Sequence, residues 1–193
     1  MDGQNLFHAA REAFGYTYPN YDVMALALSI CRMQGWNLIQ TRFYTGVPDL
    51  SADAAWHGFW VAKLAVMGRQ GIQVFSRALR YNNEKVRLPD GTRHTFLAGR
   101  EKGIDVRIAL DVIRMALRRE YDVALLFSQD QDLSEVAQEI RMIAQEQGRW
   151  IKIVSAFPAS PTTRRRRGID KTDWVRIDRT TYDACLDHRD YRP

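Results

Sequence analysis

An apolar run near the middle of the chain, VALLF, ends at Phe127 and is followed by Ser128 and two carboxylates, Asp130 and Asp132. A run of this kind is typical of a buried strand in a parallel sheet. Because ligands bind beyond the carboxyl ends of such strands, both carboxylates stand where a site is expected. Asp132 also has a simpler explanation, since together with Glu135 it has the spacing of a capping box for the next helix. That explanation does not cover Asp130.

Two further aspartates begin segments elsewhere in the chain. Asp2 opens the stretch DGQNLF, with Asn5 three residues later, and alone this tetrapeptide is a common turn. Asp105 lies in the first turn of a predicted helix, on its apolar side, where the helix macrodipole by itself favours an acid. The same helix has a stripe of charged residues that we expect to face solvent, namely Arg107, Asp111, Arg114 and Arg118. Asp111 can pair there with Arg107 and Arg114.

Asp2, Asp105, Asp130 and Asp132 could converge at one edge of a parallel sheet. Two carboxylates about 4 Å apart repel each other by about 4 kcal/mol at an effective dielectric constant of about 20. Such a cluster therefore either takes up protons or binds a hard cation. Since neither histidines nor cysteines cluster with these aspartates, oxygen-only ligation predicts Mg²⁺ or Mn²⁺ rather than zinc.

The elements that must position these residues alternate between strand and helix. Strands are predicted at residues 36–44, 71–79, 123–127 and 150–157. Helices are predicted at 23–35, 51–69 with Ser51 as the cap, 103–119 and 133–147. A hairpin with a Pro-Asp-Gly turn is predicted at 84–96, and an edge strand with a short helix closes the chain. Alternation of this kind predicts a mostly parallel sheet that helices cover on both faces.

The bulk composition is that of one folded domain spanning residues 1–193. Hydrophobic residues make up 46% and charged residues 26%, so the chain is not a disordered one. No run approaches the roughly 18 apolar residues that a membrane span needs, and the first residues lack the pattern of a signal peptide. The two cysteines, Cys31 and Cys185, are too few for a disulfide framework. We therefore expect a cytoplasmic protein with no membrane partner.

The net charge of +5 is concentrated in two places. A polar loop at about 158–170 contains four consecutive arginines, Arg164 to Arg167, with Lys171 close behind. The predicted hairpin carries a second basic stretch. Runs of like charge are often no more than solvated loops, but they also suit polyphosphate partners.

Three motifs, in order along the chain, resemble one known family. DGQNLF, KGIDVRIALDVI and YDVALLFSQDQDLSEVAQEI look like the NYN domain of the PIN-like nuclease superfamily, in its bacterial LabA-like branch. The resemblance implies a three-layer α/β/α fold and a metal-dependent endoribonuclease that uses Mg²⁺ or Mn²⁺. It places Asp2, Asp105, Asp130 and Asp132 in the acidic site as catalytic residues and metal ligands, with Asn5 and Ser128 as supporting groups. The RNA, single-stranded or structured, would be held by Arg164, Arg165, Arg166, Arg167 and Lys171, and by the arginines of the predicted hairpin.

The chain departs from this pattern in two ways. Gln129 replaces the glycine of the third motif, which restricts the turn and would narrow access to the site. The hydrophobic first strand that precedes the first motif is missing, and we expect a start upstream of Met1 or a truncation. Both departures keep a second hypothesis open, a catalytically inactive RNA-binding module. A phospho-receiver domain ranks lower because Lys152 lies within its strand, and a homodimer stays open as one common arrangement of soluble proteins.

Overall fold

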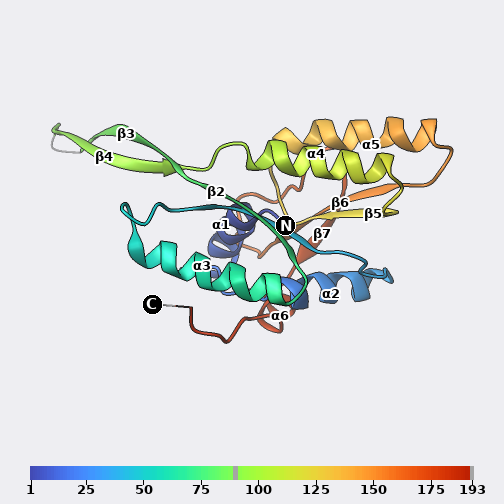
Figure 1. Cartoon of the computed structure of the whole chain (residues 1–193), viewed down its shortest axis with the longest axis horizontal. Helices are drawn as coiled ribbons and strands as arrows, with labels where there is room; N and C mark the ends of the chain where they lie inside the picture. The colour runs from blue at the N-terminus through green and yellow to red at the C-terminus, as the bar shows by residue number, and fades with distance from the viewer. Residues whose placement is uncertain (89–90, 192–193) are drawn as a thin grey trace.

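A computed structural model describes residues 1–88 and 91–191 of the chain (Figure 1). Its helices are α1 (Gly3–Phe14), α2 (Val23–Gln34), α3 (Ala54–Arg69), α4 (Ile104–Leu117), α5 (Ser134–Glu146) and α6 (Arg179–Asp183), with a 3₁₀ turn η1 (Gln131–Leu133). Its strands are β1 (Arg42–Val47), β2 (Gln73–Ala78), β3 (Arg80–Arg87), β4 (Arg93–Arg100), β5 (Val123–Leu126), β6 (Lys152–Pro158) and β7 (Asp173–Ile177). Within the described residues, no helix is long and apolar enough to cross a membrane.

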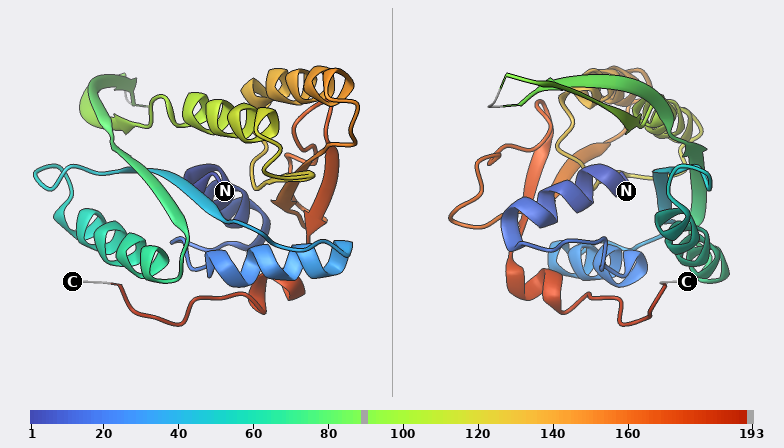
Figure 2. Two further views of the ribbon diagram at one scale, coloured as in Figure 1. Left: turned by 45° about the vertical axis from the view of Figure 1, so that its right-hand side comes forward. Right: turned by 90° about the vertical axis from the view of Figure 1, so that its left-hand side faces the viewer.

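The central layer consists of parallel strands. β1 pairs with β2, and β5, β6 and β7 pair in that order, with every pair parallel. α4 and α5 cover one side of these strands, and α2, α3 and α6 lie on the other (Figures 1 and 2). Two hydrophobic clusters fill the two interfaces. One contains Leu26 of α2 and Trp60 of α3, and the other contains Ile108 of α4 and Ile140 of α5. The predicted three-layer α/β/α fold with a mostly parallel sheet is therefore confirmed.

Met1 and Asp2 lie between the two groups of strands and bond to both. Asp2 forms a single parallel bridge with Tyr44 of β1, and the Tyr44 N–H donates to the Met1 carbonyl at 2.9 Å. On the other side, the Asp2 N–H donates to the carbonyl of Phe127 at 3.3 Å. No strand precedes α1 in the described residues. Two cavities lie between β1 and β5, one of about 120 Å³ on the side of α4 and one of about 100 Å³ on the side of α2. We call the space that they share the slot.

Several element boundaries differ from those predicted. The strand predicted from residue 36 begins only at Arg42. Asp53, not Ser51, caps α3, because its side chain accepts from the Trp56 N–H. The stretch after Asp2 is not just a turn but the start of α1, an element that was not predicted. The hairpin is confirmed as β3 and β4, while residues 89–90 of its predicted turn lie outside the described residues.

Candidate active site at the carboxyl edge of the sheet

Asp2 is held at the start of α1 by hydrogen bonds to both of its carboxylate oxygens. Oδ1 accepts from the Asn5 N–H at 3.0 Å, and Oδ2 accepts from the Ser128 hydroxyl at 3.3 Å. The helix can approach β1 closely because Gly3 has no side chain, since a Cβ there would lie 2.5 Å from a ring carbon of Phe43. Asp2 is only 4% exposed. Burial raises its pKa to about 6, and the charge of Asp105 adds to the effect.

The turn after β5 carries the next two carboxylates. Ser128 accepts from the Asp130 N–H at 3.1 Å, and the Asn5 side chain accepts from the Gln129 N–H at 2.9 Å. Asp130 accepts from the Asp132 N–H at 3.0 Å and so caps η1. The capping-box interpretation of Asp132 is therefore wrong, because α5 begins after Leu133 with no side-chain cap. Asn5 and Ser128 tie the start of α1 to the β5 turn.

α4 brings in Asp105 after Gly103, whose φ of 77° lies in the left-handed region. Asp105 is half-buried in the first turn of the helix. Burial raises its pKa, and the charges of Asp130 and Asp132 contribute to the rise. The two carboxylates of the β5 turn therefore act electrostatically on Asp105.

A fifth acid, Glu101, was not predicted. Its carboxylate accepts from the N–H of Gly46 in β1, where a Cβ would lie 2.8 Å from the same carboxylate. Burial raises the pKa of Glu101 to about 7, and the charges of Asp2 and Asp105 also raise it. Glu101 stands four residues before Asp105, and its contact with Gly46 places its carboxylate against β1.

The five acids suit a hard divalent cation in donor type, because all of their donors are oxygens and they repel one another. Their arrangement is less complete. Among residues 1–88 and 91–191, no group of three or more histidine, cysteine, aspartate or glutamate side chains is already placed to hold a metal ion. Both oxygens of Asp2 are also engaged in hydrogen bonds. Closure around an ion would require side chains to turn.

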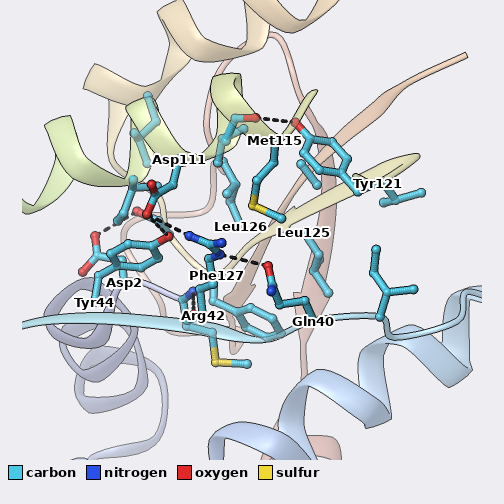
Figure 3. Close-up of a pocket in the computed structure, with 18 residues that line it drawn as sticks. Asp2, Gln40, Arg42, Tyr44, Asp111, Met115, Tyr121, Leu125, Leu126 and Phe127 are labelled. Atoms are coloured by element: carbon cyan, nitrogen blue, oxygen red, sulfur yellow. Dashed lines mark hydrogen bonds and ion pairs between the residues drawn. The ribbon is translucent and has the colours of Figure 1, made fainter. Parts of the chain in front are cut away.

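Asp111 occupies a different position from the one predicted. It is 3% exposed and lies beside Arg42 and Tyr44 in the cavity between α4 and the strands (Figure 3). Asp111 accepts from the Tyr44 hydroxyl at 2.9 Å, and its pKa is lowered: burial opposes this, but hydrogen bonds from Arg107 and Tyr44 outweigh it. It also pairs with Arg114 at 3.0 Å. The predicted pairing is confirmed, whereas the predicted solvent-facing position of Asp111 is wrong.

The basic loop lies against the turn after β5. Arg164, Arg165, Arg166, Arg167 and Lys171 are all exposed. The Gln129 side chain, which is buried, donates to the carbonyls of Arg165 at 3.2 Å and Arg167 at 2.8 Å. Lys171 donates to Gln138 of α5 at 2.7 Å. The glutamine that departs from the family motif thus binds the loop that carries the arginines.

The comparisons with known proteins agree with this arrangement at the level of the family. The family described as NYN domain matches residues 1–168. The comparison with curated proteins gave no match. Among solved structures, a ribokinase from Giardia lamblia aligns with a TM-score of 0.36 and 13% identity, over 67% of this chain and 37% of that one. That likeness is too weak to carry an argument. Because the family match covers most of the chain, the protein belongs to the NYN domain family.

Proposed function

We propose that the protein is a divalent-metal-dependent endoribonuclease of the LabA-like branch, which hydrolyses phosphodiester bonds of RNA at the acidic edge of the sheet. The nuclease-like character of the NYN family supports a hydrolase in general. The observation that carries the finer proposal is the electrostatic influence that acids from distant parts of the chain have on one another's neighbours at this edge. Asp105 raises the pKa of Asp2, Asp2 and Asp105 raise that of Glu101, and Asp130 and Asp132 raise that of Asp105.

Each residue has a role in this proposal. Asp2 and Asp130 would hold Mg²⁺ or Mn²⁺ directly, and Asp105 and Asp132 would hold it through water or orient the attacking water. A bound divalent cation supplies Lewis acidity, which polarises the scissile phosphate and lowers the pKa of a bound water. Asn5 and Ser128 keep the Asp2 carboxylate and the β5 turn in place. The arginines of the basic loop and Lys171 would bind the phosphates that flank the cleavage site.

A second candidate, an NYN-type RNA-binding module without catalysis, is favoured by two observations. The described residues hold no ready-made set of three metal-binding side chains, and each carboxylate oxygen of Asp2 already accepts a hydrogen bond from a protein donor. If those contacts persist in solution, the basic loop would bind RNA while the acids remain without a metal.

Cleavage of end-labelled RNA separates the two candidates. The purified protein is incubated with Mg²⁺, with Mn²⁺ or with EDTA, beside an Asp130→Asn variant. The asparagine oxygen can still accept from the Asp132 N–H, so this variant should fold. We expect cleavage by the parent protein with either metal, none with EDTA, and at least a hundredfold lower rate for the variant, as is typical when a charged catalytic contact is lost (about 3 kcal/mol).

Equal cleavage by both proteins would point to a contaminating nuclease and contradict the proposal. RNA binding without cleavage by either protein would favour the binding module. The homodimer and the cytoplasmic location stay predictions.

A further inference from the structure

β3 and β4 form an arm that stands apart from the body of the molecule. The two antiparallel strands pair from Arg80 opposite Arg100 at the base to Arg87 opposite Arg93 near the tip. Figure 1 shows this ribbon projecting away from the helices and the parallel strands. Eight residues in each strand give a reach of about 27 Å at roughly 3.4 Å per residue.

Packing does not explain the arm. Most of its side chains are exposed, on both faces of the ribbon, including Phe96 at 39% and Leu97 at 57%, and none of the described side chains of the arm is buried. An isolated two-stranded hairpin is marginally stable in water, and it needs either a third strand or a packed face to be stable alone. A ribbon that keeps eight paired residues per strand without either suggests that its outer surface meets a partner.

The charges of the arm indicate what kind of partner fits. The two strands contain five basic side chains, Arg80, Lys85, Arg87, Arg93 and Arg100, against one carboxylate, Glu84, which pairs with Arg100. Arginines stand directly opposite each other at both ends of the ribbon. Like charges opposite each other destabilise a hairpin by themselves, and an anion between them reverses the sign.

The charges near the tip share one face. Because side chains alternate between faces, Lys85 and Arg87 point to the same side, and Arg93 lies opposite Arg87 on that side. At its base, β4 leads directly into Glu101 and then into α4 with Asp105. The arm therefore extends outward from the edge of the sheet where the carboxylates gather.

We infer that the arm binds the phosphate backbone of RNA beyond the acidic site, and that it thereby favours RNA long enough to span both. This inference rests on the proposed function for the position of the cleaved bond, but binding by the arm can be measured without cleavage. Short RNA would occupy the acidic edge and the basic loop alone. Longer RNA, single-stranded or folded, would also reach Lys85, Arg87 and Arg93.

The test uses the full chain in an Asp130→Asn background, so that RNA is bound without being cut. Fluorescence anisotropy gives the Kd for labelled RNAs of about 6 and about 30 nucleotides, the first within and the second well above the roughly 4–16 nucleotides that one small binding site covers. An Arg87→Ala/Arg93→Ala variant is compared with an Arg32→Ala/Arg69→Ala control, which removes the same charge from exposed positions on α2 and α3.

The arm variant should bind the long RNA at least about fivefold more weakly, and its salt slope should fall by about 1.4, which corresponds to two phosphate contacts on a single strand. Its affinity for the short RNA and that of the control variant for either RNA should change by less than about twofold, because the net charge acts weakly at long range in salt. The melting temperature of the arm variant should be equal or higher, since the substitutions remove two positive charges that face each other across the ribbon.

Equal weakening toward both RNAs, or the same weakening in the control variant, would overturn the inference. Unchanged binding of the long RNA by the arm variant would also overturn it, because the arm would then bind a partner other than RNA. Failure of the nuclease proposal would appear separately, as absence of metal-dependent cleavage by the parent protein, and would leave these binding constants valid.

Discussion

At the scale of single residues, two glutamines link the basic loop to the acidic turn. Gln129 donates to the carbonyls of Arg165 and Arg167. Gln131 donates to the carbonyl of Gly168 at 2.9 Å and accepts from the Asp170 N–H at 3.1 Å. Both glutamines flank Asp130. The side chains that would bind phosphate are therefore positioned by the same turn that carries the proposed metal ligands.

Replacing Gln129 by alanine should weaken RNA binding more than it slows the reaction. The change removes two donors and leaves two loop carbonyls without their partners. The free energy that holds the loop against the turn should fall by about 1–3 kcal/mol. We expect the KM for RNA to rise about three- to tenfold, with kcat reduced by less than about twofold, because Asp130 keeps its contact with Ser128. Steady-state kinetics with one RNA substrate gives both constants.

Gln138→Ala is the matched control, since Gln138 contacts Lys171 at one end of the loop and not the arginines. It should raise KM less than Gln129→Ala does. A fall in kcat at constant KM would contradict a role in positioning the loop. It would instead assign Gln129 to the shape of the acidic turn.

At the scale of elements, the helices and strands could be predicted mainly where one face is apolar. α2 was predicted to end near Gly35, and it does, because Gly35 adopts a left-handed conformation with a φ of 71°. α1 was not predicted, although Leu6, Ala10 and Phe14 have helical spacing and are buried. Asp2 and Gly3 were interpreted as a turn, and a short helix that follows a capping aspartate is easily hidden by that signal.

The charged face of α4 shows why part of the site could not be predicted. A helical projection places Asp111 with its arginine neighbours, but it contains no information about β1. Tyr44 and Arg42 of that strand contact Asp111, and these contacts bury the side of the helix that carries it. Glu101 and the contacts of Gln129 likewise depend on residues far away in sequence. Acids at strand ends can be predicted from pattern, whereas their partners require the tertiary structure.

The slot between β1 and β5 leads to a prediction about the element that would fill it. Val123, Leu125 and Phe127 of β5 and its turn border both cavities, and Ile108 and Ala27 close them toward α4 and α2. The Met1 nitrogen already donates to the Arg42 carbonyl at 2.6 Å, as a strand amide would. A strand bonded to Met1 would run parallel to both neighbours and be apolar on both faces.

We expect that adding five apolar, β-prone residues before Met1 will stabilise the protein. Burial of about 1.5–3 kcal/mol per side chain exceeds an ordering cost of about 1–2 kcal/mol per residue, which leaves a net gain of about 2–4 kcal/mol. For a chain of this length, the melting temperature should rise by about 5–10 °C. Differential scanning calorimetry measures the change directly.

An extension of five glycine and serine residues serves as the control for added length. It can continue the chain but brings no apolar surface into the cavities. If the two extensions melt at the same temperature, the slot does not accept a strand.

At the scale of the whole molecule, the fold concentrates negative charge at one edge of a protein whose net charge is +5. The acids of that edge repel one another, and two of them, Asp2 and Glu101, have pKa values raised to about 6 and about 7. The folded state is thus less stable without a cation than the same fold with fewer acids. Stability and metal binding are coupled through these side chains, because a ligand that binds only the folded state stabilises it.

This coupling predicts opposite effects of one substitution with and without metal. In EDTA, Asp105→Asn should melt at an equal or higher temperature than the parent protein, because it removes a repelling charge from the acidic edge. With Mn²⁺ at about 100 times its Kd, the parent protein should gain about 2.7 kcal/mol, or roughly 5–10 °C, and the variant should gain far less.

Glu146→Gln, at an exposed position on α5, should behave like the parent protein in both conditions. Thermal unfolding by circular dichroism provides these temperatures without any RNA, so the result does not depend on catalysis. A parent protein that gains nothing from Mn²⁺ or Mg²⁺ would contradict the metal site and shift the balance toward the inactive RNA-binding module, because the acids would then have no ion to hold.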